Sequence, residues 1–137
     1  AEEVLGDYRA TGLTLRAHPL ALLRHLPPFN RCSRYVDLGH ISHRGFVRIA
    51  GVVTCRQRPG TASGVLFLTL EDETGNSNVV VWPRTQEHFR AALMNGRLLV
   101  VKGTLEHKDG VTHIIAGALE DHSSALASLP VQSRDFH

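Results

Sequence analysis

Phe67 and Asn78 have the residue types and the spacing that predict a binding chemistry in this sequence. They lie in two apolar stretches, residues 64–70 and 78–82, which an acidic turn joins, as is typical of two antiparallel strands. Because side chains alternate along a strand, Phe67 faces away from the neighbouring leucines, and Asn78 joins it on that face. An aromatic ring stacks on a nucleobase, and an amide hydrogen-bonds its edge. The hairpin therefore predicts a surface for unpaired bases, unless the rest of the domain covers this face.

Arginines precede this hairpin in the sequence. The net charge of the 137-residue chain is only +2, but Arg48, Arg56 and Arg58 fall in a stretch that contains no acidic residue. Such a strip supplies salt-sensitive phosphate contacts in nucleic-acid grooves, although scattered arginines are also common on solvated surfaces. The acidic residues gather instead at positions 71–73, where we expect the carboxylates to be solvated in the turn.

The remaining sequence predicts the elements that position these residues. A helix is expected at residues 19–26, with Pro19 in its first turn, packing against something outside this chain. A long strand is expected at residues 46–58, with a bend at Gly51. A second helix starts after Pro83 and stops at Gly96. Two further strands, at residues 98–105 and 111–118, are joined by a turn that contains Asp109 and Gly110.

This order of three strands, one helix and two strands predicts a mainly β domain with the OB-fold. The OB-fold is a five-stranded Greek-key barrel with its helix between the third and fourth strands. We place the barrel at residues 45–120, after a helical and irregular appendage at 1–44 and before a tail at 121–137. OB-folds bind ligands on the face of their second and third strands and in the adjoining loops. The predicted nucleic-acid-binding residues are Arg48, Arg56, Arg58, Phe67, Thr69, Asn78 and Lys108.

Other chemistries find little support in the sequence. The histidine pairs His40 and His43, and His107 and His113, lack the three or four convergent ligands of a zinc site, so no metal site is predicted. No phosphate-binding glycine loop or nucleophile motif is present, and we predict no catalytic residue and no cofactor in this chain. Two cysteines are too few for a disulfide framework, and no signal peptide or membrane-spanning run is present, which predicts a cytoplasmic protein without a membrane partner.

Several motifs resemble the OB domain of bacterial C-family DNA polymerases, the family of the polymerase III alpha subunit. They are Gly51-Val52-Val53-Thr54, the run from Phe67 to Gly75, and the run from Val79 to Pro83. The run from Thr54 to Ala62 and the ending Ser133-Arg134-Asp135-Phe136-His137 resemble the error-prone paralogue in particular. Upstream, Thr11-Gly12-Leu13 and His18-Pro19-Leu20 resemble the segment that links the fingers region to the OB domain.

The resemblance implies a parent enzyme that polymerises DNA across lesions during damage-induced mutagenesis, with Mg²⁺ held by palm-domain carboxylates upstream of this chain. It implies that this domain contacts the single-stranded template. The implied partners are the rest of the polymerase chain, a catalytically inactive Y-family protein and, through it, the sliding clamp, in the bacterial cytoplasm at the nucleoid. Two alternatives stay open: an RNA-binding anticodon domain of a class II aminoacyl-tRNA synthetase, which shares the hairpin motif, and an OB-fold protein adaptor.

Overall fold

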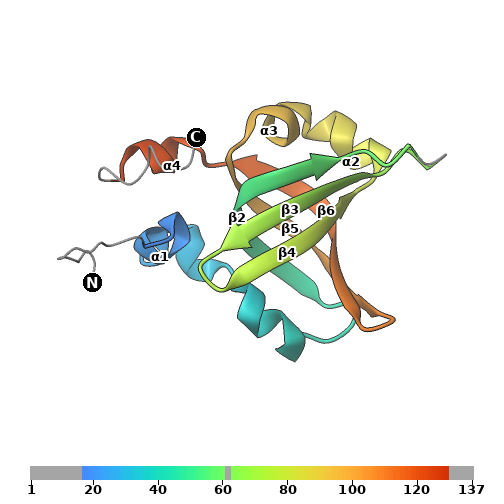
Figure 1. Ribbon diagram of the computed structural model, residues 1–137, viewed down its shortest axis with the longest axis horizontal. Coiled ribbons are helices and arrows are strands. Elements are labelled where there is room, and N and C mark those ends of the chain that lie inside the picture. Colours follow the sequence, from blue (N-terminus) through green and yellow to red (C-terminus); the bar gives the residue numbers. More distant parts are fainter. Residues whose placement is uncertain (1–16, 61–62, 130–137) are drawn as a thin grey trace.

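The computed structural model describes residues 17–60 and 63–129, in which five strands form one closed barrel (Figure 1). The order around the barrel is β2-β3-β4-β6-β5. The strands are β2 (Phe46–Gln57), β3 (Leu66–Asp72), β4 (Gly75–Val81), β5 (Leu98–Lys108) and β6 (Val111–Asp121). Two short helices, α2 (Pro83–His88) and α3 (Arg90–Asn95), occupy the connection between β4 and β5. The predicted OB-fold barrel, with its helical segment between the third and fourth strands, is confirmed.

The barrel closes through β4 and β6, which run parallel, whereas all other neighbouring strands are antiparallel. The parallel pairing joins Asn78–Val80 to His113–Ile115. In the regular parts of the strands, alternate residues point inward, as the two-residue period of a strand requires. The inward residues form one core whose members include Ile49, Leu68, Leu70, Val79, Val101, Leu105 and Ile114.

Strand β2 serves two neighbours, as its embedded glycine predicts. Its first half pairs with β5 up to Val52, and its second half pairs with β3 from Val52 onward. At the changeover the backbone approaches β3 closely, because a Cβ added at Gly51 would lie 2.8 Å from the Cβ of Leu70. A glycine is needed at this corner because any side chain would push the two strands apart.

A bulge between Val53 and Cys55 interrupts the alternation of β2. Beyond it, Arg56 pairs with the core residue Leu68, and Gln57 pairs with Phe67. Arg56 therefore shares the face of Leu68 and Cys55 shares the face of Thr69, the reverse of an uninterrupted alternation along this strand. The extra residue of a bulge moves each later side chain to the opposite face.

The outer face of β2 and β5 is covered by a second core. Helix α1 (Pro19–Leu23), the 3₁₀ turn η1 (Phe29–Arg31) and helix α4 (Ser124–Ala127) pack their apolar side chains on it. Its buried members are Leu20, Leu23, Phe29, Ala50, Val52, Leu98, Val100 and Leu126. The predicted first helix is present. It packs on the barrel itself, so the prediction that it packs against something outside this chain is wrong.

Helix α1 begins at a histidine cap. The Nδ1 atom of His18 accepts a hydrogen bond from the backbone N–H of Leu20 at 3.1 Å. Burial lowers the pKa of His18, against the opposing attraction of Glu71 and Glu73. The uncharged ring, whose Nδ1 can accept the bond, is thereby favoured.

The acidic turn between β3 and β4 fastens this appendage to the barrel. Arg24 donates to both carboxylate oxygens of Glu73, at 2.8 and 3.1 Å, and its guanidinium lies 3.5 Å from the carboxylate of Asp72. Asp72 is only 5% exposed and accepts hydrogen bonds from the backbone N–H groups of Tyr35, Thr74 and Gly75. The prediction that these carboxylates are solvated is wrong for Asp72 and Glu73.

The last helical segment before the barrel, the 3₁₀ helix η2 (Tyr35–His40), places Leu38 in the main core. The predicted helical end before residue 17, and the polar tail with its Ser133–His137 motif, lie outside the described residues. No helix in the described part of the chain is long and apolar enough to cross a membrane.

We expect Asp72→Ala to lower the free energy of unfolding by about 2–4 kcal/mol, because it removes a buried carboxylate that accepts from three part-buried backbone donors and pairs with Arg24. Urea denaturation followed by circular dichroism measures the loss. The matched control is Asp37→Ala, which removes the half-exposed ion pair with Arg34 and costs about 0.5 kcal/mol or less. Equal losses in the two variants would contradict a fastening role for Asp72.

Candidate nucleic-acid interface

A cavity of about 410 Å³ opens on the outer face of β3, β4 and β6. Its lining includes Phe67, Val80, Trp82, Glu106, His113 and Ile115, and we call it the aromatic cavity. The strand register explains why these residues meet, because Phe67 pairs with Val80 and Val80 pairs with Ile115. These three residues form an apolar row across the sheet, on the face opposite the core.

The ring of Phe67 is half-buried and lines this cavity, so the appendage does not seal it in the interior. Trp82 stands beside it with 46% of its surface exposed. Trp82 is not among the binding residues predicted from the sequence, although the signal is present there. The alternation that places Asn78 and Val80 beside Phe67 continues to residue 82, whose backbone is still extended.

A polar row runs beside the apolar row. Thr69 pairs with Asn78, Asn78 pairs with His113, and His113 pairs with Glu106. Asn78 is exposed and Thr69 is half-buried. The predicted residues Phe67, Thr69 and Asn78 therefore share one accessible face, whereas His113 and Glu106 were not predicted as members of it.

Lys108 lies at the end of β5, two residues beyond Glu106, and is exposed. It precedes the turn of the β5–β6 hairpin, in which Asp109 and Gly110 both have positive φ angles, of 53° and 77°. This is the two-residue turn that the Asp-Gly sequence predicts. The turn places Lys108 at the rim of the outer face, next to the polar row.

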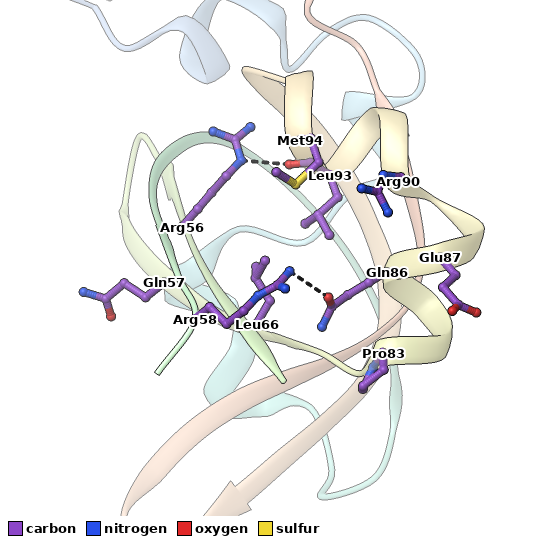
Figure 2. A pocket seen from close by; sticks show the side chains of 10 residues that line it. All are labelled: Arg56, Gln57, Arg58, Leu66, Pro83, Gln86, Glu87, Arg90, Leu93 and Met94. Carbon is purple, nitrogen blue, oxygen red and sulfur yellow. Dashed lines mark hydrogen bonds between the residues drawn. The ribbon is translucent and has the colours of Figure 1, made fainter. Parts of the chain in front are cut away.

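A second cavity, of about 550 Å³, lies between the end of β2 and helices α2 and α3, and we call it the arginine cavity (Figure 2). Arg56, Arg58 and Arg90 contribute its charge, and Leu66, Pro83 and Met94 are among its apolar lining residues. The two cavities flank the same two chain segments, because Leu66 and Pro83 line this one while their neighbours Phe67 and Trp82 line the aromatic cavity.

Arg58 and Gln86 organise the mouth of the arginine cavity. An Nη of Arg58 donates to Oε1 of Gln86 at 3.0 Å, the contact drawn in Figure 2. The amide nitrogen of Gln86 donates to the carbonyls of Gly64 and Val81, both at 2.9 Å. One side chain thus ties the segment that enters β3 to the end of β4 and holds an exposed guanidinium at the surface.

Arg56 has a different environment. Its Nε donates to the carbonyl of Leu93 at 2.7 Å (Figure 2). Its terminal nitrogen donates to the carbonyl of Gly96. These carbonyls lie at the carboxyl end of α3. A cation there donates hydrogen bonds to carbonyls that have no partner within the helix, and it interacts favourably with the helix dipole. The β2 bulge directs the side chain to this position, so Arg56 does not share the outer face that carries Phe67.

Arg48 is also separate from the aromatic cavity. It pairs across strands with Lys102 on β5, and its guanidinium carbon lies 6.0 Å from the ring centre of Phe46. This places it on the first half of β2, whereas Phe67 pairs with Gln57 at the other end of that strand. The structure therefore divides the predicted arginine strip between two locations, with Arg48 on the first half of β2 and Arg56 and Arg58 at the arginine cavity.

The described residues also give evidence on metal ligation and on one cysteine. Within them, no group of three or more His, Cys, Asp or Glu side chains is placed to hold a metal ion. Burial raises the pKa of the Cys32 thiol to about 11, so this cysteine remains protonated at neutral pH. The geometry of the accessible face supports binding.

The sequence matches the model of the OB-fold nucleic acid binding domain over residues 47–121. This match covers the barrel from its first strand to its last. The chain belongs to that family. The error-prone polymerase resemblance is likewise confirmed by curated relatives that match almost the whole chain.

The error-prone DNA polymerase of Saccharophagus degradans is 60% identical over 96% of this chain, and that of Teredinibacter turnerae is 53% identical over 99% of it. The chain spans only 13–14% of the length of these relatives. Among solved structures, asparaginyl-tRNA synthetase from Pyrococcus horikoshii, complexed with asparaginyl-adenylate, is 28% identical with a TM-score of 0.50, covering 58% of this chain and 19% of the synthetase.

We expect Arg56→Met to lower the free energy of unfolding by about 1–2 kcal/mol, because the helix carbonyls lose a charged donor while the aliphatic stem is kept. Thermal and urea denaturation measure this loss. Arg58→Met is the matched control, since its exposed hydrogen bond to Gln86 contributes little to stability. A stability loss for Arg58→Met as large as that for Arg56→Met would contradict the distinction.

Proposed function

We propose that this OB domain binds single-stranded DNA as the template-contacting module of an error-prone, translesion DNA polymerase that acts in damage-induced mutagenesis. The observation that carries the proposal is the arrangement of the two cavities. Phe67 and Trp82 border the aromatic cavity, and directly across the same two chain segments Arg58 and Arg90 border the arginine cavity. A single strand needs both kinds of surface, one for its bases and one for its phosphates.

The aromatic cavity supplies a stacking surface for bases. Every base has a π-face, so stacking on Phe67 or Trp82 tolerates any sequence, as a template-binding module requires. Asn78 and Thr69, in the adjacent polar row, present groups that can hydrogen-bond base edges. Lys108 adds a cation at the rim of this face.

The arginine cavity supplies phosphate contacts. Arg58 and Arg90 are exposed, and the apolar lining beside them gives a low-dielectric wall that strengthens their attraction for anions. Arg56 contributes through α3, because its guanidinium is engaged by backbone carbonyls. The proposed contact set therefore keeps Arg58, Phe67, Thr69, Asn78 and Lys108 from the sequence analysis and adds Trp82 and Arg90.

The catalytic part of the proposed polymerase lies outside the described residues. They contain no cluster of carboxylates that could hold Mg²⁺, so we assign the implied metal to other parts of the longer protein. The proposed partners are the template strand, the rest of the polymerase chain and, at one remove, a Y-family protein and the sliding clamp, in the bacterial cytoplasm at the nucleoid.

RNA binding is the second candidate function. The observation that favours it is the similarity to asparaginyl-tRNA synthetase, at 28% identity over 58% of this chain. Competition between DNA and RNA oligonucleotides of the same sequence separates the two functions. Preferential binding of one RNA loop would favour an anticodon-type function, whereas binding of neither nucleic acid would favour a protein adaptor.

We expect Phe67→Ala and Trp82→Ala each to weaken binding of a mixed-sequence DNA single strand by about 1–3 kcal/mol, the usual contribution of one stacked base. A fluorescence anisotropy titration with a labelled oligonucleotide measures the dissociation constants. Tyr35→Ala is the control, since this ring is also 42% exposed but lies against Gly75 at the other end of the β3–β4 hairpin. An unchanged affinity in both cavity variants would refute the assignment of this face.

We expect Arg58→Met and Arg90→Met each to reduce the slope of log affinity against log salt concentration by about 0.7, the value for one phosphate contact in a single strand. The measurement is the same titration repeated over a series of salt concentrations. Arg34→Met provides the comparison, because Arg34 is exposed and pairs with Asp37 in the appendage. If all three variants share the wild-type slope, the arginine cavity does not contact phosphates.

A further inference from the structure

The aromatic cavity contains one carboxylate that the proposed function does not use. Glu106, on β5, lines this cavity together with Phe67, Trp82 and His113. It stands at the end of the polar row, because it pairs with His113, which in turn pairs with Asn78. A carboxylate repels phosphate groups. Its presence in a surface proposed to hold a polyanion is therefore better explained by a contact with the bases.

The carboxylate of Glu106 is half-buried and has no hydrogen-bond or ion-pair partner among the described residues. It differs in this respect from Glu73, which Arg24 binds, and from Glu120, which Lys102 binds at 2.9 Å. Glu106 therefore keeps its acceptor capacity for a ligand that enters the cavity. A carboxylate accepts hydrogen bonds and, when ionised, donates none.

The geometry separates the two charges that a nucleotide would meet. The arginines lie on the other side of the chain segments that carry Phe67 and Trp82, so a phosphate held there is kept away from Glu106. A base stacked against the aromatic rings would then direct one edge along the polar row toward Glu106. An acceptor at this position favours a base edge that carries hydrogen-bond donors and repels one that carries carbonyl oxygens.

Resting on the proposed function, we infer that Glu106 makes the aromatic cavity select bases with an exocyclic amino group. Cytosine presents an N4 amino group, which is the pairing that Glu makes with this base, whereas thymine presents a carbonyl oxygen at the corresponding O4 position. The two pyrimidines have similar size and both can stack, so the difference between them isolates this hydrogen bond. His113 and Asn78 complete the row along which the base edge lies.

The test compares short oligo-dC and oligo-dT of equal length, bound to the 137-residue chain at slightly alkaline pH, where cytosine is not protonated. We expect oligo-dC to bind about fivefold more tightly than oligo-dT, the lower end of the range for a good base contact. In Glu106→Gln this ratio falls to about one, because an amide can donate to the thymine oxygen as readily as it accepts from the cytosine amine.

Glu87→Gln is the matched control. Glu87 lines the arginine cavity, so this change removes the same charge beside Arg58 and Arg90. It should strengthen binding of both oligonucleotides equally and leave their ratio unchanged. Circular dichroism confirms that both variants fold.

Three outcomes are decisive in different ways. The base preference would be overturned if the wild-type chain bound oligo-dC and oligo-dT equally, or if the fivefold ratio of their affinities persisted in Glu106→Gln. Either result would leave the proposed single-strand binding intact. A lost ratio in Glu87→Gln as well would overturn the base preference too, since charge alone would then account for the effect. Failure of the wild-type chain to bind either oligonucleotide would overturn the proposed function, and this inference with it.

Discussion

The parallel pairing of β4 with β6 is the contact on which the candidate interface depends. It closes the barrel, and it brings Asn78 beside His113 and Val80 beside Ile115, although these residues are about 35 positions apart in the chain. Without it, the strands would form an open sheet with β4 at one edge, and Phe67 and Val80 would lose Ile115 as their neighbour. Closure also pairs the edge of β4 at Asn78–Val80, which would otherwise be open to pairing with other strands.

One outer face of the barrel is covered by other parts of the chain, and another is left open. The face of β2 and β5 carries Ala50, Val52, Leu98 and Val100, and the appendage and α4 cover it with apolar side chains. The face of β3, β4 and β6 carries a mixture of aromatic, amide and charged groups and is left open. The apolar part of the β2–β5 face is therefore buried and the mixed face is left open, because apolar surface gains most from burial.

The fold was predictable because it rests on local signals. Alternating apolar residues marked the strands, Asp109 and Gly110 marked one turn, and a helix between the third and fourth strands fixed the barrel topology. The site was only partly predictable. Phe67, Thr69 and Asn78 follow from alternation along one hairpin, but a bulge has no clear signature in the sequence, and the bulge after Val53 decides the side on which Arg56 lies.

Long-range contacts explain the other differences between prediction and structure. Nothing in the run of acids at positions 71–73 shows that Arg24, 49 residues away from Glu73, binds it. Likewise the pairing of Glu106 and His113 was foreseeable from their hairpin, but their position beside Phe67 depends on the parallel closure by β6. Pairings between distant segments are where a single sequence carries the least information.

The β3–β4 hairpin joins two functions at its two ends. At its turn, Asp72 and Glu73 hold the segment that enters the domain, and at its open end Phe67 and Trp82 border the aromatic cavity. Each strand has seven residues, or about 20 Å of paired backbone. The hairpin thus sets both the distance and the direction from the appendage to the aromatic cavity, so a ligand bound in that cavity would have a defined orientation relative to the appendage.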